Sequence, residues 1–335
     1  MISRIYHSSR FQSLRFLAII CFMATWWSVR PAQAEQLSSR VLALYPPEAG
    51  EVVFVDLRDA RRSPYFNQVQ EQIMPQSFRN LEQVAATLGV DFNRNVDRLS
   101  WAYVDTNGHP AQSDLMGVAE GSFDQEAAIQ AVKERKLRAT RYAGMRVFSL
   151  GSAENGREFV LAFTESSDCV FGFRDSVQSM LTRAAQGGSN VMNNESMRRL
   201  VDDVNRDSPI WMVLNGNFTQ LGVRQLLAEA ARMPGLDTLS SRVQSATVRM
   251  DLDRGLAAKI SAHCATSADA MWFSTLLQGA LAMERQLQSS KNPAMARVLG
   301  TSQVQREDEK VSLDVSVPES DLAALIQTNG LVLHF

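Results

Sequence analysis

The segment "GEVVFVDLRDARRSPYFNQVQEQIMP" (residues 50–75) carries the pattern that decides the fold. An apolar run at Val52–Val55 is followed by a polar turn, and apolar residues then recur at helical spacing up to Met74 and Pro75. A short apolar run predicts a buried strand, and apolar residues three or four positions apart predict an amphipathic helix. We therefore expect a strand, a turn and a helix in this order.

The same order recurs later in the chain. The segment "SPIWMVLNGNFTQLGVRQLLAEAARMP" (208–234) predicts a strand, a turn at 215–217 and a helix that again ends in Met-Pro. In each half a block of strand, hairpin, strand and helix follows, and then a block of strands and a helix. These blocks are 96–135 and 145–184 in the first half, and 243–281 and 301–328 in the second. A repeated order of elements indicates tandem structural units.

Each unit is therefore predicted to have the order β-α-ββ-α-ββ-α, with an additional helix at 78–89 in the first. Hairpins that alternate with helices define an α+β fold, in which a curved antiparallel sheet packs against helices. The two units would form either one long sheet or two facing lobes. The glycine-rich segment 187–190 is the expected linker, so we expect a leader at 1–34, a first repeat at 35–190 and a second at 191–335.

Local signals predict where several elements begin. We expect helix N-caps at Asp124, Asp175 and Ser267, because short polar side chains accept hydrogen bonds from the first helical turn. Turns between strands are expected at three dipeptides that contain glycine: Asn107-Gly108, Asn155-Gly156 and Arg254-Gly255.

The first 34 residues have the layout of a secretory signal peptide. A basic start with Arg4, Arg10 and Arg15 precedes the 12-residue apolar stretch "FLAIICFMATWW". The small residues of "AQA" at 32–34 predict cleavage after Ala34. An uncleaved membrane anchor is the alternative, but 12 apolar residues are too few to span a bilayer as a stable helix. We expect a periplasmic or secreted protein with no transmembrane segment after cleavage.

Removal of the leader makes the chain more acidic. The leader contains four of the 34 basic residues and none of the 36 acidic ones, so the remainder has 30 basic residues and a net charge of −6. No long basic run remains, which argues against nucleic acid or an anionic membrane surface as a partner.

Two cysteines follow the leader, Cys169 and Cys264. An oxidising compartment permits a disulfide between them. Two buried, unpaired thiols that pack as small hydrophobic groups are the alternative. The sequence leaves both possibilities open.

The sequence contains no motif for a known chemistry. There is no G-x-S-x-G element, and the neighbours His263 and Cys264 would point to opposite faces of a strand. No C-x-x-C, H-x-x-H or calcium-loop spacing occurs, and no glycine-rich loop leads from a strand into a helix. We therefore expect no metal and no cofactor. A hydrolase that uses paired carboxylates remains open, because any two acids can meet in space.

A cluster of charges follows the first strand. Asp56, Arg58, Asp59, Arg61 and Arg62 are either a ligand site for an anion or a network of ion pairs on the surface. The second unit makes the same turn as "MVLNGNFTQLG", without any arginine. The turn therefore does not require these charges, and the five residues are the candidate ligand-binding residues.

Two features favour the binding of apolar molecules. The chain contains 14 methionines, and flexible methionine side chains adapt to apolar ligands or fill an ordinary core. The helix expected at 267–290 has a stripe that would pack on a sheet, and Trp272 lies off this stripe, exposed or in an interface. The stripe consists of Ala270, Phe273, Leu276, Leu277, Ala280 and Met283.

Four segments carry a resemblance to a known group. They are "LYPPEAGEVVFVDLRDARRSPYF" (44–66), "GSFD" (121–124), "YAGMRVFSL" (142–150) and "FVLAFTESSDCVFGFRDSVQSML" (159–181). The chain resembles exported bacterial proteins of unknown function, common in Acidobacteria, with a strand before L-R-x-S-P, G-x-F-D before a helix and Y-x-G before a strand. The resemblance covers almost the whole chain after the leader and implies repeated α+β units. It implies no activity, so no functional residue follows from it.

The leading hypothesis is an exported, non-enzymatic binding protein that uses a groove between the repeats or an exposed sheet face. Its partner would be a small molecule, a lipid or a protein of the cell envelope. The alternatives are an exported hydrolase with paired carboxylates and a cell-envelope assembly subunit that self-associates. Facing acids with raised pKa values would favour the hydrolase, an apolar cavity would favour a lipid-like ligand, and an exposed apolar patch would favour assembly.

Overall fold

The structure is a computed structural model that describes residues 36–73, 82, 85–86, 89–105, 113–152, 156–205, 208–226 and 240–328. The expected signal peptide, most of the helix expected at 78–89, the turn expected at 107–108 and Asn155 of the turn expected at 155–156 lie outside the described residues.

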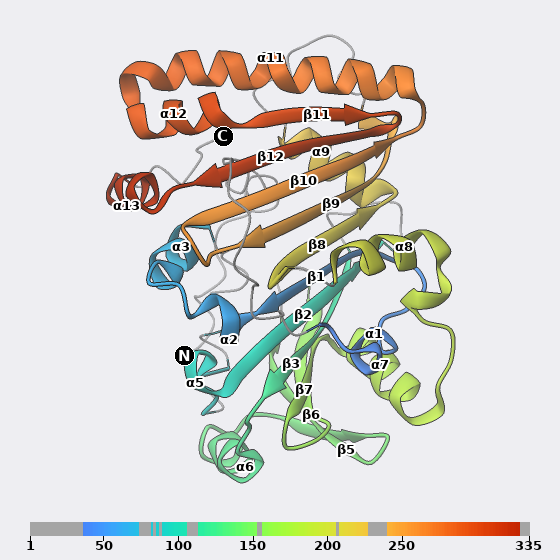
Figure 1. Ribbon diagram of the computed structural model, residues 1–335. Helices are drawn as coiled ribbons and strands as arrows, with labels where there is room; N and C mark the ends of the chain where they lie inside the picture. Colours follow the sequence, from blue (N-terminus) through green and yellow to red (C-terminus); the bar gives the residue numbers. More distant parts are fainter. Residues whose placement is uncertain are drawn as a thin grey trace. The chain divides into compact units, whose positions relative to one another are not determined.

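The described residues form two compact units. The first contains 37–58 and 82–198, and the second contains 59–73 and 199–328. Each unit consists of antiparallel strands with helices between them (Figure 1). The expected α+β class is therefore confirmed.

Seven strands form the sheet of the first unit, and every neighbouring pair is antiparallel. In order across the sheet they are β1 (Ala49–Asp56), β2 (Val96–Val104), β3 (Asp114–Gly121), β7 (Asp168–Phe173), β6 (Glu158–Phe163), β5 (Met145–Ser152) and β4 (Ala139–Tyr142). β1 is buried along nearly its whole length. This explains why the sequence has an apolar run there rather than an alternating pattern.

Short helices and three longer ones accompany this sheet among the described residues. α7 packs on β3, β6 and β7 and buries Val177, Met180 and Leu181. The helices within or at the border of this unit are α1 (Ser39–Leu42), α2 (Leu57–Ala60), α5 (Phe92–Asn95), α6 (Gln125–Glu134), α7 (Arg174–Gln186), the 3₁₀ helix η3 (Val191–Asn193) and α8 (Glu195–Val204).

The first unit departs from the expected order at one place. Between α6 and α7 the chain forms four strands, β4 to β7, and not two. β4 is a largely exposed strand of four residues, and Ala143 and Gly144 join it to β5, both with positive φ. A turn of this kind ordinarily uses Asn-Gly or Asp-Gly, so Ala-Gly gave no signal for the additional hairpin.

The second unit has a sheet of five strands, again antiparallel throughout. In order they are β8 (Ile210–Asn215), β9 (Val243–Asp251), β10 (Leu256–Cys264), β12 (Lys310–Val317) and β11 (Gln303–Glu307). The helices of this unit are α3 (Phe66–Ile73), α9 (Asn217–Leu226), α11 (Ser267–Lys291), α12 (Pro293–Thr301) and α13 (Glu319–Gln327). The strand, turn and helix expected near 50–75 and 208–234 are present as β1 with α3 and as β8 with α9.

Of the three predicted helix caps, one is confirmed and two are not. Asp124 caps α6, since its side chain accepts a hydrogen bond of 2.9 Å from the Ala127 amide. The prediction for Ser267 is wrong by one residue, because the hydroxyl of Thr266 accepts from the Asp269 amide instead. Asp175 lies in the first turn of α7, whose N-cap has no capping side chain.

The turn expected at Arg254-Gly255 is confirmed. Gly255 has a φ of +100°, and a Cβ there would lie 2.0 Å from the Val317 carbonyl oxygen. Only glycine fits this position without strain.

α11 contacts β10, β11, β12 and α12, and it follows the edge of the unit in Figure 1. Phe273 and Leu277 of its predicted stripe are buried, but Met283 is 48% exposed. The stripe therefore ends earlier than expected, and Trp272 is 68% exposed. None of the described helices is both long and apolar enough to cross a membrane.

Candidate functional site: an apolar cavity in the second unit

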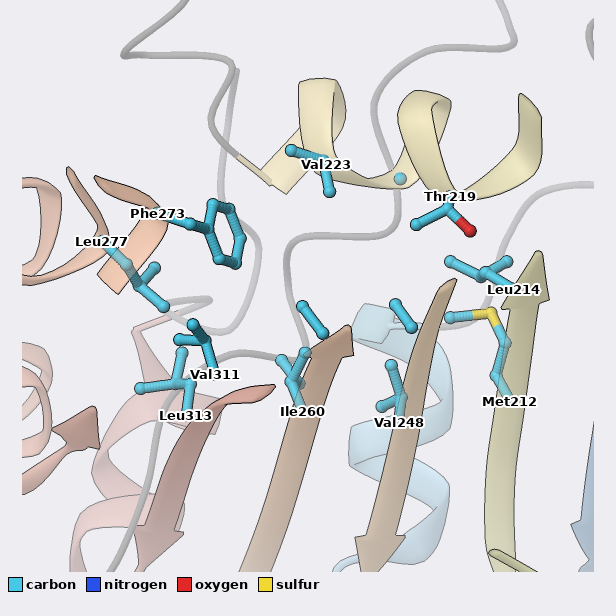
Figure 2. Close-up of a pocket in the computed structure, with 13 residues that line it drawn as sticks. Met212, Leu214, Thr219, Val223, Val248, Ile260, Phe273, Leu277, Val311 and Leu313 are labelled. Carbon is cyan, nitrogen blue, oxygen red and sulfur yellow. The ribbon is translucent and has the colours of Figure 1, made fainter. Parts of the chain in front are cut away.

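A cavity lies inside the second unit, between its sheet and the helices α9 and α11 (Figure 2). The strands contribute alternate residues, such as Val248 on β9 and Ile260 on β10, so these side chains share one face of the sheet. The full lining is Met212, Leu214, Thr219, Gly222, Val223, Ala246, Val248, Ile260, Ala262, Phe273, Leu277, Val311 and Leu313.

The helices close the cavity from the other side. Figure 2 shows Val223 and Thr219 of α9 and Phe273 and Leu277 of α11 facing the side chains of the strands. Gly222 allows a close approach, because a Cβ on it would lie 2.9 Å from Cδ1 of Leu214. α9 therefore packs directly on β8 at one end of the cavity.

The polarity of the lining restricts what can bind. No lining residue carries a charge, and Thr219 is the single polar side chain among them. Its hydroxyl donates a hydrogen bond of 3.3 Å to the Gln244 carbonyl oxygen. A polar ligand would lose its bonds to water here and gain none, so the cavity suits an apolar group.

The volume of the cavity is about 50 Å³. A protein cavity that binds benzene has a volume of about 150 Å³. As it stands, the space accepts the end of an apolar chain or a small branched group. A bulkier group requires α9 or α11 to move away from the sheet.

The charged residues predicted as a ligand site lie elsewhere and form local ion pairs. Arg58 contacts Asp97 on β2, with 2.7 Å between Nη2 and Oδ2. Arg62 pairs with Asp59, three residues earlier. Each of these arginines therefore faces a carboxylate within its own unit, which favours the interpretation as surface ion pairs.

The other two members of that cluster are less exposed. Asp56 is the last residue of β1 and is buried, and its register partner on β2 is Arg98. Arg61 is half-buried after α2. Ligand binding by these five residues stays a prediction.

Most buried acids of the structure lie next to a base. Glu120 pairs with Arg98 at 3.5 Å, Asp314 pairs with Lys259 at 3.5 Å, and Asp168 pairs with Arg40. Such pairing is the usual condition for a charge inside a protein. These pairs join neighbouring strands or a strand and a helix, so their geometry is that of structural contacts.

Glu51 differs from these acids. Its side chain is 5% exposed, and its Oε1 has no hydrogen-bond partner. Burial raises the pKa of Glu51 to about 8, and burial, with a smaller contribution from the charge of Glu51, raises the pKa of its register partner Tyr103. The register partner of Glu51 on β2 is Tyr103 and not a second acid, so a hydrolase with paired carboxylates stays a hypothesis from the sequence.

The structure contains both cysteines as free, buried thiols. Cys169 lies on β7 of the first unit and Cys264 ends β10 of the second. Burial raises the pKa of both thiols, that of Cys264 to about 11. In the structure they therefore resemble unreactive core thiols, and the disulfide considered from the sequence stays a prediction.

Metal binding and histidine chemistry have little support among the described residues. No group of three His, Cys, Asp or Glu side chains among them could hold a metal ion. His263 is half-buried, and its pKa is lowered by burial and by the charge of Lys310. The cavity itself was missed by sequence reasoning, although the alternating apolar residues of β9 and β10 signal one buried sheet face.

Comparisons with known proteins bear on the fold. No protein-family model matches the chain, and no curated protein matches its sequence significantly. The solved structure of crystal form III of TP0453 is similar, with a TM-score of 0.51 and 10% sequence identity over 87% of this chain and 99% of that chain. Crystal forms I and IV of TP0453 give TM-scores of 0.45 and 0.46, at 9% and 10% identity. They cover 89% and 85% of this chain and 100% and 96% of those chains. At such identity the similarity concerns the fold alone.

Proposed function

We propose that this chain is an exported, non-enzymatic binding protein that takes an apolar group into the cavity of its second unit. The observation that carries the proposal is the lining, in which 13 residues contain no charged side chain. A site built for catalysis needs groups that exchange protons or carry charge. A site built for binding an apolar group needs only complementary shape and the exclusion of water.

The volume of the cavity limits the size of the group that can bind. The ligand presents a terminal methyl group, a short alkyl branch or the end of an acyl chain, since about 50 Å³ is available. Each methylene moved out of water contributes about 0.8 kcal/mol. Affinity for a longer chain would depend on outward movement of α9, which contacts β8 and β9.

The place of action follows from the leader. A basic start, an apolar stretch of 12 residues and small residues before position 35 support export with cleavage after Ala34. The protein would then meet its ligand in the periplasm or outside the cell.

We also propose that the two units are tandem repeats. The order β8-β9-β10-β12-β11 in the second unit has the same connections as β1-β2-β3-β7-β6 in the first. In both, a helix follows the first strand, a helix follows the third, and a helix follows the strand that pairs with the third. The first unit then differs by the additional hairpin of β4 and β5. This agreement supports a duplication followed by an insertion.

Native mass spectrometry of the protein purified from its own host tests the binding function. An additional mass that organic solvent extracts as an apolar molecule is the expected result. In parallel, Ala246→Leu should fill the cavity and remove the additional mass. Ala258→Gly is the control. Ala258 lies on β10, on the same face of the strand as the lining residues Ile260 and Ala262, but it does not line the cavity.

Two results would contradict the proposal. One is a protein without additional mass whose unfolding temperature does not rise with short alkanes or benzene. The other is a bound molecule that Ala246→Leu retains at the original level, because such a molecule occupies a different site.

A further inference from the structure

α11 exposes an apolar surface that the binding cavity does not use. All the exposed large hydrophobic side chains of the described residues lie on this one helix: Met271, Trp272, Met283 and Leu287. They are 52%, 68%, 48% and 48% exposed. An exposed apolar patch of this kind marks an interaction surface.

The surface carries no charge over most of its length. Between Asp269 and Glu284 the helix has no charged residue. Glu284 accepts a hydrogen bond of 2.7 Å from Gln288 on the same helix, and the guanidinium of Arg285 lies against Gly300 of α12. The exposed face therefore consists of apolar, small and uncharged polar side chains, the last including Gln278 and Gln286.

The centre of the face is open. A Cβ on Gly279 would meet nothing within 4 Å, and Gly279 lies midway between Trp272 and Leu287. Thr275 and Ala282 each lie about one helical turn from Gly279, and both are small and exposed. Small residues in the middle of a helix face allow a second helix to approach closely.

We propose that α11 is the interface through which two copies of this chain form a weak, symmetric dimer. In a two-fold arrangement a contact from residue i to residue j occurs twice. An antiparallel pair of α11 helices centred on Gly279 places Trp272 of one copy beside Met283 and Leu287 of the second. The large side chains then fill both ends, and the glycines meet in the middle.

Charge complementarity supports the antiparallel pairing. Asp269 lies at the start of α11 and Lys291 at its end. The proposed arrangement brings the acidic end of each helix to the basic end of the other, and the helix dipoles are opposed, which is the favourable orientation. No like-charged pair is created across the two-fold axis.

The available area sets the strength of the dimer. The face runs from Trp272 to Leu287, about 24 Å at 1.5 Å per residue. A single helix face of this length offers on the order of 500 Å² per copy, at the lower limit of about 1,000 Å² for a specific interface. The dimer is therefore expected to dissociate in the micromolar range.

A second copy fits the face better than a lipid surface does. Helices that lie in a membrane interface carry many Lys and Arg side chains around their apolar face. α11 has one Arg and one Lys in its 25 residues, and both lie within its last seven residues. Its neutral, glycine-centred face matches the requirements of helix packing.

Sedimentation velocity of the full chain in detergent-free buffer, over about 1–200 µM, measures the equilibrium directly. Trp272→Glu and Met283→Lys should each raise the dimer dissociation constant at least tenfold. At concentrations where the wild type is monomeric, neither should alter the unfolding temperature, because both positions are exposed. Gln130→Glu on α6, an exposed position of the first unit, is the control with an equal change of charge to Trp272→Glu.

Mixing the two variants gives the sharpest result. A heterodimer of Trp272→Glu with Met283→Lys has one Glu–Lys contact and one intact Trp–Met contact, so the mixture should dimerise although neither variant does alone. Gly279→Leu, which keeps the face apolar but blocks close approach, should also leave a monomer.

Three outcomes would overturn the proposal. They are a wild-type chain that stays monomeric throughout this range, variants that dimerise as the wild type does, and a mixture that does not recover the dimer. Flotation with phosphatidylglycerol-phosphatidylethanolamine vesicles tests the lipid surface. If the monomer floats with the vesicles and Trp272→Glu abolishes this flotation, the face binds a membrane instead.

Discussion

The ring of Phe171 on β7 covers Gly117 on β3. The two residues are register partners across the strand pair, and a Cβ on Gly117 would lie 2.2 Å from Cζ of Phe171. The glycine therefore makes room for an aromatic ring inside the first sheet, where Phe171 is 3% exposed.

Gly117→Ala should destabilise the protein by about 1–3 kcal/mol, because the added methyl group forces the ring or the strand to move. Urea unfolding followed by circular dichroism measures the change. Gly279→Ala, measured at a concentration at which the chain is monomeric, is the matched control: it lies in a helix with open space around it, and it should stabilise the protein by up to about 1 kcal/mol. Equal effects of the two substitutions would show that Phe171 does not constrain Gly117.

Glu51 should make the stability depend on pH. Burial raises the pKa of its carboxyl to about 8 from 4.5. In the unfolded chain this group loses its proton at a lower pH than in the folded chain, so the folded state is favoured fully below about pH 4.5 and loses this contribution as the pH rises towards 8. The slope is at most about 1.4 kcal/mol per pH unit.

Glu51→Gln should remove this dependence, which urea unfolding from pH 5 to pH 9 would detect. Glu158→Gln is the control, because a hydrogen bond from Arg174, with help from Ser149, lowers the pKa of Glu158 to about 2. Its contribution is present above about pH 4.5 and is lost as the pH falls towards 2. A wild-type stability that does not fall between pH 5 and pH 8 would contradict the buried acid.

Arg58→Ala tests the charge cluster after β1. The Arg58–Asp97 pair is 57% and 35% exposed, so its loss should change the free energy of unfolding by less than about 1 kcal/mol. We expect inorganic phosphate to leave the unfolding temperature of the wild type unchanged. A rise with phosphate that both Arg58→Ala and Arg61→Ala abolish would establish the anion site predicted from the sequence.

Leu313→Ala should enlarge the cavity of the second unit. Leu313 is 1% exposed and lines the cavity, so the substitution should cost about 2–5 kcal/mol. Benzene should then raise the unfolding temperature of the variant more than that of the wild type, since binding to the folded state stabilises it. Leu322→Ala on α13 is the control, an equally buried leucine outside the lining. Equal benzene effects on the two variants would place the binding elsewhere.

The thiols should be inaccessible in the folded chain. Cys169 and Cys264 are each 2% exposed, so a thiol reagent should label neither under native conditions and both after unfolding without a reductant. Mass spectrometry counts the labels on protein purified from the oxidising compartment. No labelling after unfolding would demonstrate the disulfide that the sequence permits.

Elements with strong local signals could be predicted well. β1 and β8 follow from their apolar runs, Asp124 caps α6, and Gly255 makes the turn before β10. The β4 and β5 hairpin could not be predicted, because its turn is Ala-Gly and its first strand is exposed. The cap of α11 was misplaced because Thr266 and Ser267 are both capable of capping a helix.

The candidate site was less predictable than the fold. The sequence drew attention to arginines and acids that the structure places in separate ion pairs, Arg58 with Asp97 and Arg62 with Asp59. The cavity residues had no distinctive chemistry, because an apolar side chain that lines a small space has the same local pattern as one that fills a core.

By itself, the sequence determined the period of the apolar residues, the positions of most strands and helices, and the turn at Gly255. These properties depend on neighbouring residues and on the geometry of the backbone. Tertiary structure alone decided that Thr219 and Leu277 face the same cavity, that Glu51 is buried without a hydrogen bond to one oxygen, and that Trp272 is left in solvent. Those outcomes depend on contacts between residues far apart in the chain, which a local pattern does not encode. Segment 50–75 combines both: its strand and helix follow from the pattern, whereas the partners of its arginines come from the fold.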